Sequence, residues 1–148
     1  VAKDVDEGRL RLVEEGARRL GLTIIEASCV DPVREQLPDG LFDRILVDVP
    51  CSNTGVLGKR PEARWRISAE GIEELSRLQQ GLLQQAITRL AVSGRLVYST
   101  CSVEQEENEA IVAAALKEHP ELRLEAERHH EPGQPADGGY QALLVRAE

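Results

Sequence analysis

The stretch LFDRILVDVPCSNTG, residues 41–55, decides the fold class of this 148-residue chain. Apolar and β-branched residues dominate residues 41–49, which predicts a buried strand with Asp48 near its end. Pro50 fixes its own φ and favours an extended backbone at Val49, so the turn after the strand is stiff. This turn carries Cys51 into a long polar loop. A carboxylate and a thiol therefore leave the same strand together.

Strand and helix patterns alternate along the rest of the chain. Upstream, short strands are expected at residues 1–3 and 23–27. Apolar residues at helical spacing predict a helix between them, over residues 10–20. This order of elements is typical of an α/β fold with a mostly parallel sheet.

Downstream residues continue the alternation. Ser68 is a candidate N-cap of a long helix, and a buried strand is expected at residues 95–100. The sequence SVEQ at residues 102–105 fits a capping box, which predicts the start of a second helix. Strands at residues 122–128 and 141–146 then follow without a helix between them. They predict an antiparallel hairpin at one edge of the sheet.

A second cysteine follows the strand at residues 95–100. Because Cys101 would stand at the start of the next helix, the helix dipole is expected to favour its thiolate, the nucleophilic form. Ligands of α/β sheets bind beyond the carboxyl ends of the strands. We therefore expect five side chains to gather at that edge, namely Asp4, Asp31, Asp48, Cys51 and Cys101. The alternatives are polar strand ends for the acids and structural burial for the cysteines.

The chain is acidic, with 18 Lys and Arg against 26 Asp and Glu and a formal net charge of -8. A freestanding nucleic-acid-binding protein usually has a basic face, so phosphate contacts here must be local or come from another domain. A basic stretch at residues 59–66 offers such contacts. Its four cations are Lys59, Arg60, Arg64 and Arg66. We interpret Trp65 in the same stretch as an anchor of the loop to the core rather than as a substrate contact.

Other features exclude several classes of protein. Three cysteines without a C-x-x-C pair argue against a disulfide scaffold and a zinc site, and no metal is expected. No apolar run approaches the ~18 residues of a membrane span, and no signal segment opens the chain, which predicts a cytoplasmic protein without a membrane partner. The four acids in residues 104–109 are interpreted as the solvated start of a helix.

Two motifs give the chain a resemblance to a known family. They are DVPCSNTG at residues 48–55 and YSTCS at residues 98–102, the second followed by EEN at residues 106–108. Both resemble the motifs of the Sun-type RNA (cytosine-5)-methyltransferases, most closely the bacterial members that act on 16S ribosomal RNA. The resemblance covers almost the whole chain. Further matches are Arg60, Pro61, Trp65, Leu78, Gln79, Leu83 and DGGY at residues 137–140.

The resemblance implies a Rossmann-like, S-adenosylmethionine-dependent methyltransferase that acts on RNA, with ribosomal RNA the expected substrate. It implies that Cys101 attacks carbon 6 of a cytosine and that S-adenosylmethionine then methylates carbon 5. Cys51 would assist removal of the carbon-5 proton and release of the enzyme. Asp48 would lie between cofactor and base, Asp4 would hold the cofactor ribose, and Asp31 would lie near the adenine. Covalent addition suits this poorly nucleophilic carbon, because it divides one difficult step into two easier ones.

The cofactor site also needs a glycine-rich turn after a first strand, about 20 residues before the acid that holds the ribose. No G-x-G sequence occurs in the chain, and Asp4 fits that acid, so the turn is expected upstream of Val1. We therefore expect residues 1–148 to be the C-terminal portion of one methyltransferase domain. A gap would stand in the sheet where the first strand belongs. An upstream RNA-binding domain is expected in the parent protein, and it would compensate for the acidic charge.

Three other interpretations remain open at this point. A methyltransferase acting on an amino group would use the D-x-P turn but would leave Cys101 without a role. A non-catalytic remnant or binding subunit would fold but would not bind the cofactor. A thiol-based redox protein would oxidise Cys51 and Cys101 reversibly.

Overall fold

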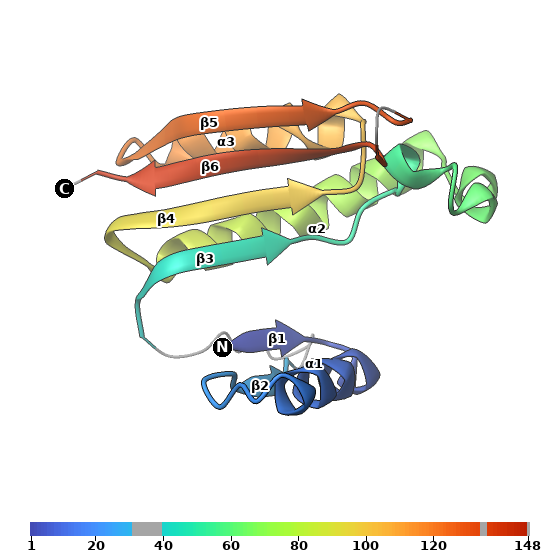
Figure 1. Ribbon diagram of the computed structural model, residues 1–148. Coiled ribbons are helices and arrows are strands. Elements are labelled where there is room, and N and C mark those ends of the chain that lie inside the picture. The colour runs from blue at the N-terminus through green and yellow to red at the C-terminus, as the bar shows by residue number, and fades with distance from the viewer. Residues whose placement is uncertain (31–39, 134–135, 148) are drawn as a thin grey trace. The chain divides into compact units, whose positions relative to one another are not determined.

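The computed structural model describes residues 1–30, 40–133 and 136–147. The chain forms two compact units, Val1–Asp39 and Gly40–Glu148 (Figure 1). Asp31, which was expected to lie near the adenine, is outside the described residues. No helix in the part of the chain that the structure describes is long and apolar enough to cross a membrane.

The first unit is a small β-α-β arrangement. Strand β1 (Ala2–Asp4) leads into helix α1 (Glu7–Arg19), and strand β2 (Ala27–Cys29) pairs with β1 in parallel. The Asp6 carboxylate caps α1 by accepting hydrogen bonds from the backbone N–H groups of Gly8 and Arg9. The short strand expected at residues 23–27 is present but displaced toward the C-terminus, because its register with β1 pairs Ala2 with Ala27.

The second unit contains a four-stranded mixed sheet in the order β3-β4-β6-β5 (Figure 1). Its strands are β3 (Phe42–Asp48), β4 (Leu90–Thr100), β5 (Leu122–His130) and β6 (Gly139–Arg146). Strands β3 and β4 are parallel, whereas β6 is antiparallel to both β4 and β5. The predicted hairpin is confirmed, with β5 at the edge of the sheet. The two-stranded sheet of β1 and β2 belongs to the first unit.

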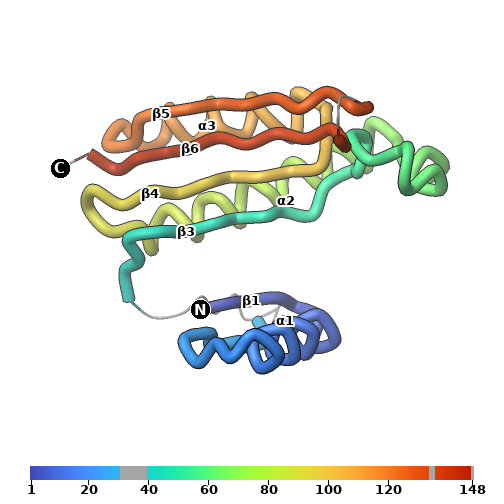
Figure 2. Tube along the Cα trace, in the orientation of Figure 1, coloured from blue at the N-terminus to red at the C-terminus, as the bar shows by residue number. Residues whose placement is uncertain are grey.

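Two helices, α2 (Ala69–Thr88) and α3 (Glu109–Glu118), lie on the same face of the four-stranded sheet (Figures 1 and 2). The predicted cap of α2 is confirmed, since the Ser68 hydroxyl accepts a hydrogen bond from the Gly71 N–H at 3.0 Å. The helices and the sheet bury a shared apolar core, which supplies most of the stability of this unit. Its most buried members include Leu83, Ile87, Leu90, Leu96, Ile111 and Leu144.

The predicted helix start at residues 102–105 was wrong. Helix α3 begins at Glu109, and only a short 3-10 turn, Gln105–Glu107, precedes it. The Ser102 hydroxyl is engaged elsewhere, because it accepts from the Glu104 N–H at 3.0 Å and lies 3.1 Å from the Thr54 hydroxyl. Cys101 is therefore in a loop well ahead of the helix, not at its N-terminus.

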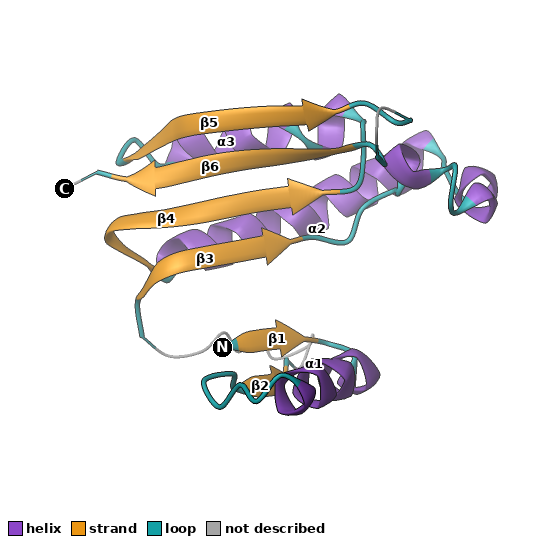
Figure 3. Ribbon diagram, viewed as in Figure 1, coloured by secondary structure: helices purple, strands orange, loops and turns teal. Residues whose placement is uncertain are grey.

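The parallel pairing of β3 and β4 positions the candidate site. The register places Asp48 opposite Ser99, so both strands end together (Figure 3). The Val49 N–H extends the pairing by donating to the Ser99 carbonyl at 3.1 Å. The loops that carry Cys51 and Cys101 consequently leave the sheet side by side.

Candidate active site

The two cysteine thiols meet at the end of β3 and β4. The Sγ atoms of Cys51 and Cys101 are 3.1 Å apart. Cys51 is buried, with 8% of its surface exposed, and Cys101 is partly exposed. The sequence-based expectation that these side chains gather is confirmed for this pair. A thiol donates a hydrogen bond to its neighbour across this distance.

Asn53 joins the two loops. Its side-chain oxygen accepts from the Cys101 thiol at 3.1 Å, and its side-chain N–H donates to the Cys51 carbonyl at 2.8 Å. The backbone of Asn53 has a φ of 63°, in the left-handed region that Asn tolerates better than most residues. The sequence analysis did not single out Asn53. Its place in the turn after Pro50 and Cys51 is the signal that could have identified it.

The two thiols hold their protons differently. The hydrogen bond from Cys51 lowers the pKa of Cys101 to about 7, against opposition from burial and from the negative charge of Asp48. Arg60 adds a smaller lowering effect. The same hydrogen bond, together with burial, strongly raises the pKa of Cys51. Cys101 is therefore the thiol of the pair that ionises near neutral pH, at which point it no longer donates to Asn53, and Cys51 keeps its proton.

The physical cause of this thiolate differs from the expected one. A helix dipole was expected to stabilise it, but α3 begins at Glu109, beyond the first-turn range over which a dipole acts. The neighbouring thiol, fifty residues away in the sequence, does so instead.

A tight backbone contact at Gly55 fixes the loop of Cys101. The Gly55 N–H donates to the Cys101 carbonyl at 3.0 Å, and the Gly138 N–H donates to the Gly55 carbonyl at 2.8 Å. A Cβ atom at residue 55 would lie 2.4 Å from the Gly138 oxygen and 2.8 Å from the Cys101 oxygen. Only glycine fits between these two segments.

The interpretation of residues 104–109 as solvated was wrong for Glu107, which is fully buried. Its carboxylate accepts from the Ser52 N–H and from the Gln79 side chain, both at 2.9 Å. An acidic run gives no signal that one of its members is buried. The signal that could have found Glu107 is Gln79 in the middle of α2. A buried glutamine there needs a polar partner, and Glu107 is that partner.

The described acids of the expected cluster, Asp48 and Asp4, belong to different units. Asp48 is the exposed last residue of β3, and its charge acts on Cys101. Asp4 is the last residue of β1 in the first unit. One of its carboxylate oxygens accepts from the Asp6 N–H at 2.9 Å, and the other lies 3.6 Å from Arg9.

The basic stretch divides by environment. Lys59 forms an ion pair with Asp137 at 2.7 Å. Arg60 and Arg66 line a pocket of about 260 Å³ that also includes Cys51 and Asn53, whereas Arg64 is exposed outside that lining. Trp65 is 85% exposed, so its interpretation as an anchor to the core was wrong. The short 3-10 helix Pro61–Trp65 presents its indole to solvent instead.

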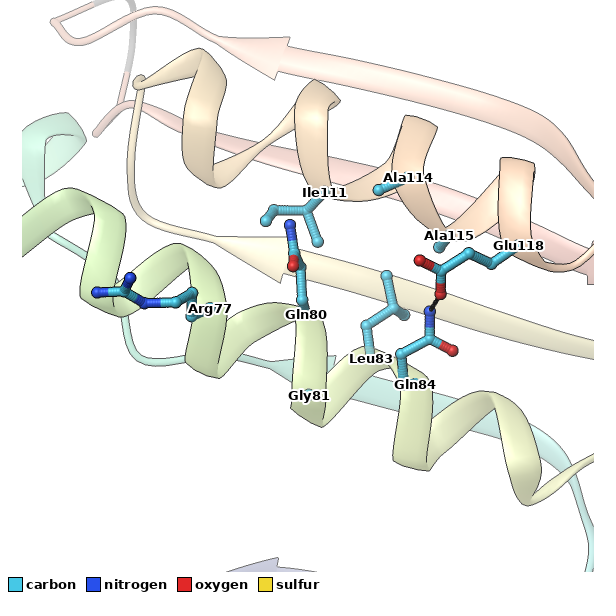
Figure 4. A pocket seen from close by; sticks show the side chains of 9 residues that line it. All are labelled: Arg77, Gln80, Gly81, Leu83, Gln84, Ile111, Ala114, Ala115 and Glu118. Carbon is cyan, nitrogen blue, oxygen red and sulfur yellow. Dashed lines mark hydrogen bonds between the residues drawn. The ribbon is translucent and has the colours of Figure 1, made fainter.

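A second hollow, of about 240 Å³, lies between α2 and α3 (Figure 4). Figure 4 shows side chains of both helices around it, including Ile111 and Leu83, and a hydrogen bond from Gln84 to Glu118. It contains neither cysteine. Of these two described pockets, the one beside Cys51 adjoins reactive groups.

The sequence and the fold match known proteins over most or all of the chain. The family described as 16S rRNA methyltransferase RsmB/F matches residues 1–145. The ribosomal RNA small subunit methyltransferase B of Vibrio cholerae is 39% identical over 155 residues, which cover 99% of this chain and 36% of that protein. The probable ribosomal RNA small subunit methyltransferase B of Bacillus subtilis is 36% identical over 121 residues, which cover 80% of this chain and 27% of that protein.

A solved structure also matches the chain. NSun6 from Pyrococcus horikoshii, solved with SFG, matches with a TM-score of 0.85 and 28% identity, covering 99% of this chain and 41% of that chain. The arrangement described above is thus the Rossmann-like fold of S-adenosylmethionine-dependent methyltransferases. The chain covers well under two thirds of each of these relatives. On the family match, the sequence identity and the fold, the chain belongs to the 16S rRNA methyltransferase RsmB/F family.

Proposed function

We propose that the protein methylates carbon 5 of a cytosine in ribosomal RNA through a covalent adduct on Cys101. S-adenosylmethionine is the methyl donor of its family. The observation that carries the proposal is the thiol pair, with Sγ atoms 3.1 Å apart and the pKa of Cys101 lowered to about 7 while that of Cys51 is raised. A methyltransferase that acts on an amino group needs no such pair.

The first step uses the thiolate. Cys101 adds to carbon 6, so a sulfur–carbon bond forms and the electron pair of the ring double bond moves toward carbon 5. That carbon becomes nucleophilic enough to accept the methyl group. Addition of the thiolate puts negative charge on the ring, and a proton taken from solvent at ring nitrogen 3 neutralises it. Asp48 stands at the end of β3, near Cys101, where its carboxylate can hold that proton in place by accepting a hydrogen bond from the ring N–H.

The second step returns the free enzyme. The carbon-5 proton leaves, the ring double bond re-forms, and the sulfur–carbon bond breaks to release the Cys101 thiolate. The largest cause of the raised pKa of Cys51 is its hydrogen bond to Cys101. That bond is broken once the Cys101 sulfur is bonded to carbon 6, so Cys51 then gives up its proton to solvent more readily. As a thiolate it can take the proton from carbon 5.

The carboxylate of Asp4 is a chemically suitable partner for the ribose of the cofactor. Asp4 is held at the end of β1 by the Asp6 N–H, which fixes the direction of its carboxylate, and carboxylates accept hydrogen bonds from ribose hydroxyls. We propose that Asp4 holds the ribose and that Asp31 lies near the adenine. S-adenosylmethionine would supply the electrophilic methyl group beside Asp48.

The RNA would approach over the pocket beside Cys51. Arg60 and Arg66 line it together with Glu62, and both arginines are exposed, so they can contact phosphate. Arg64 and the exposed indole of Trp65 extend this surface, and Trp65 offers a face on which a base can stack. Lys59 contributes less, because Asp137 already neutralises it.

The test is a transcript of 16S ribosomal RNA that contains 5-fluorocytosine, incubated with S-adenosylmethionine and the native-length protein. Fluorine at carbon 5 cannot leave as a proton does, so the adduct should persist and map by mass spectrometry to Cys101. A methyl group on an amino nitrogen, or an adduct on another residue, would reject the proposal. A non-catalytic binding subunit would give neither adduct nor methylation.

A further inference from the structure

The backbone on either side of Cys51 is held by two buried side chains. The Gln79 side-chain N–H donates to the Pro50 carbonyl at 2.9 Å, just before Cys51. The Ser52 N–H donates to the Glu107 carboxylate at 2.9 Å, just after it. Gln79 and Glu107 are both fully buried. The direction of the Cys51 side chain is therefore set from both sides.

Glu107 is the centre of this arrangement. One carboxylate oxygen accepts from Gln79 as well as from the Ser52 N–H, and the other accepts from the Ser52 hydroxyl at 2.5 Å. Its backbone carbonyl accepts from the Tyr98 hydroxyl at 2.7 Å, which ties it to β4. Through its carboxylate and its carbonyl, Glu107 thus joins the loop after β3, the middle of α2 and the strand that leads to Cys101.

Burying this carboxylate costs more free energy than a residue with only a packing role would need to. Every group that donates to it is neutral, and a buried carboxylate without a cation is expensive unless hydrogen bonds compensate. An apolar side chain would fill the same space at lower cost. Only a hydrogen-bond acceptor at residue 107 can hold both the N–H and the hydroxyl of Ser52 in one direction.

We propose that Glu107 is a positioning residue that aims the Cys51 thiol at the reaction centre and so controls release of the Cys101 adduct. This inference rests on the proposed function. Glu107 does not touch either sulfur in the described contacts, so it acts through Ser52 and the turn that contains Cys51. Removal of its carboxylate should impair release more than attack.

The test compares Glu107→Ala with Glu107→Gln in the native-length protein. A glutamine oxygen can still accept from the Ser52 N–H and Gln79, and its NH₂ can donate to the Ser52 hydroxyl, which is free to turn toward Ser102, 3.2 Å away. Glu106→Ala is the matched control, because the neighbouring Glu106 side chain is exposed. Three measurements are made: turnover on ribosomal RNA, the fraction of protein in a covalent RNA adduct on a denaturing gel, and the rate at which diamide joins Cys51 and Cys101 in a disulfide. Diamide accepts the two electrons and two protons that the thiols give up.

Glu107→Ala should lower turnover roughly tenfold to a hundredfold, accumulate the covalent adduct, and slow disulfide formation. In Glu107→Gln, turnover, adduct fraction and disulfide rate should all return close to the values of the unmodified protein. Glu106→Ala should match the unmodified protein. Equal decreases of adduct and turnover in Glu107→Ala, or an unchanged disulfide rate, would overturn the positioning role.

Two further variants keep the test decisive. If Glu107→Ala does not fold, Ser52→Ala removes the hydroxyl and its contacts with Glu107, Thr54 and Ser102 but keeps the N–H bond to Glu107. This variant should change the same three measurements in the same direction by a smaller factor. No change in Ser52→Ala would then count against the inference. Cys51→Ala separates the two proposals. If it accumulates no adduct, the proposed function fails in its division of roles, while the disulfide rate in the Glu107 variants still tests positioning.

Discussion

The Cys101 sulfur lies 3.1 Å from the Cys51 sulfur, and each thiol changes the proton affinity of the other. The contact exists because β3 and β4 are parallel neighbours that end in register, at Asp48 and Ser99. Each strand then turns out of the sheet within three residues and delivers its cysteine. The reactivity of Cys101 is thus a property of two loops held together, and it can be measured without RNA.

Alkylation by iodoacetamide should follow the ionisation of Cys101. Its lowered pKa of about 7 means that the thiolate is formed as the pH rises through 7, and that at pH 6 only about a tenth of it remains. Mass spectrometry of the labelled peptides over pH 5 to 10 measures this directly. Cys51→Ala removes the hydrogen bond that lowers the pKa, so the midpoint for Cys101 should move upward toward the ordinary cysteine range. A midpoint that stays near 7 in that variant would show another cause.

The two cysteines should fail in opposite ways when each is replaced. Cys101→Ala removes the nucleophile, so methylation and adduct should both disappear. Cys51→Ala leaves the nucleophile but removes the group proposed to take the carbon-5 proton, so a covalent protein–RNA adduct should accumulate on a denaturing gel. Cys29→Ala is the control, because this exposed cysteine belongs to the first unit. Disappearance of the adduct in both active-site variants would contradict the assigned roles.

Replacing Gly55 by alanine should destabilise the second unit. The added Cβ would lie 2.4 Å from the Gly138 oxygen and 2.8 Å from the Cys101 oxygen, and both are backbone atoms that cannot move independently. We expect a decrease of about 1–3 kcal/mol in the free energy of unfolding. Gly81→Ala is the matched control, since nothing lies within 4 Å of its new Cβ and alanine favours the helix. Urea unfolding should show opposite signs for the two variants, and an unchanged stability in Gly55→Ala would refute the close approach.

Local sequence patterns predicted the parts of this structure that local forces determine. The strand before Asp48, the Ser68 cap and the hairpin of β5 and β6 depend on periodicity, capping and turns, and all three are present. The expected burial of that strand was wrong, because β3 is an end strand of the described sheet and Leu46 is 70% exposed. The local sequence at Ser102 matched the capping-box pattern equally well. It failed because the Ser102 hydroxyl contacts Thr54, forty-eight residues away, which no local pattern contains.

In the candidate site, too, some features could be predicted from the sequence, and others depend on contacts that only the folded chain makes. Cys51 and Cys101 could be predicted to meet, because both follow strands of one parallel sheet. The burial of Glu107 could not, because it depends on donors from Ser52 and Gln79 that only the folded chain brings together. The exposure of Trp65 was missed for a related reason: its large apolar surface suggests a core contact, but a short 3-10 helix directs it to solvent.

The two arginines that line the pocket should matter more for RNA binding than the other cations of residues 59–66. Arg60→Ala combined with Arg66→Ala should weaken binding to a ribosomal RNA fragment and lower the slope of log affinity against log salt by about one for each phosphate that is no longer neutralised. Lys59→Ala is the control, because its ion pair with Asp137 already neutralises it and its removal should change the slope little. Fluorescence anisotropy over a salt series measures both quantities.

Arg60 carries a second expectation that separates phosphate binding from a general charge effect. Its positive charge helps to lower the pKa of Cys101, so Arg60→Ala should shift iodoacetamide labelling of Cys101 to higher pH. Arg64→Ala should leave labelling unchanged, because Arg64 does not line the pocket. Equal effects of the Arg60 and Arg64 variants on both labelling and salt slope would mean that the loop acts only through its net charge. The pocket beside Cys51 would then not be the path of the RNA.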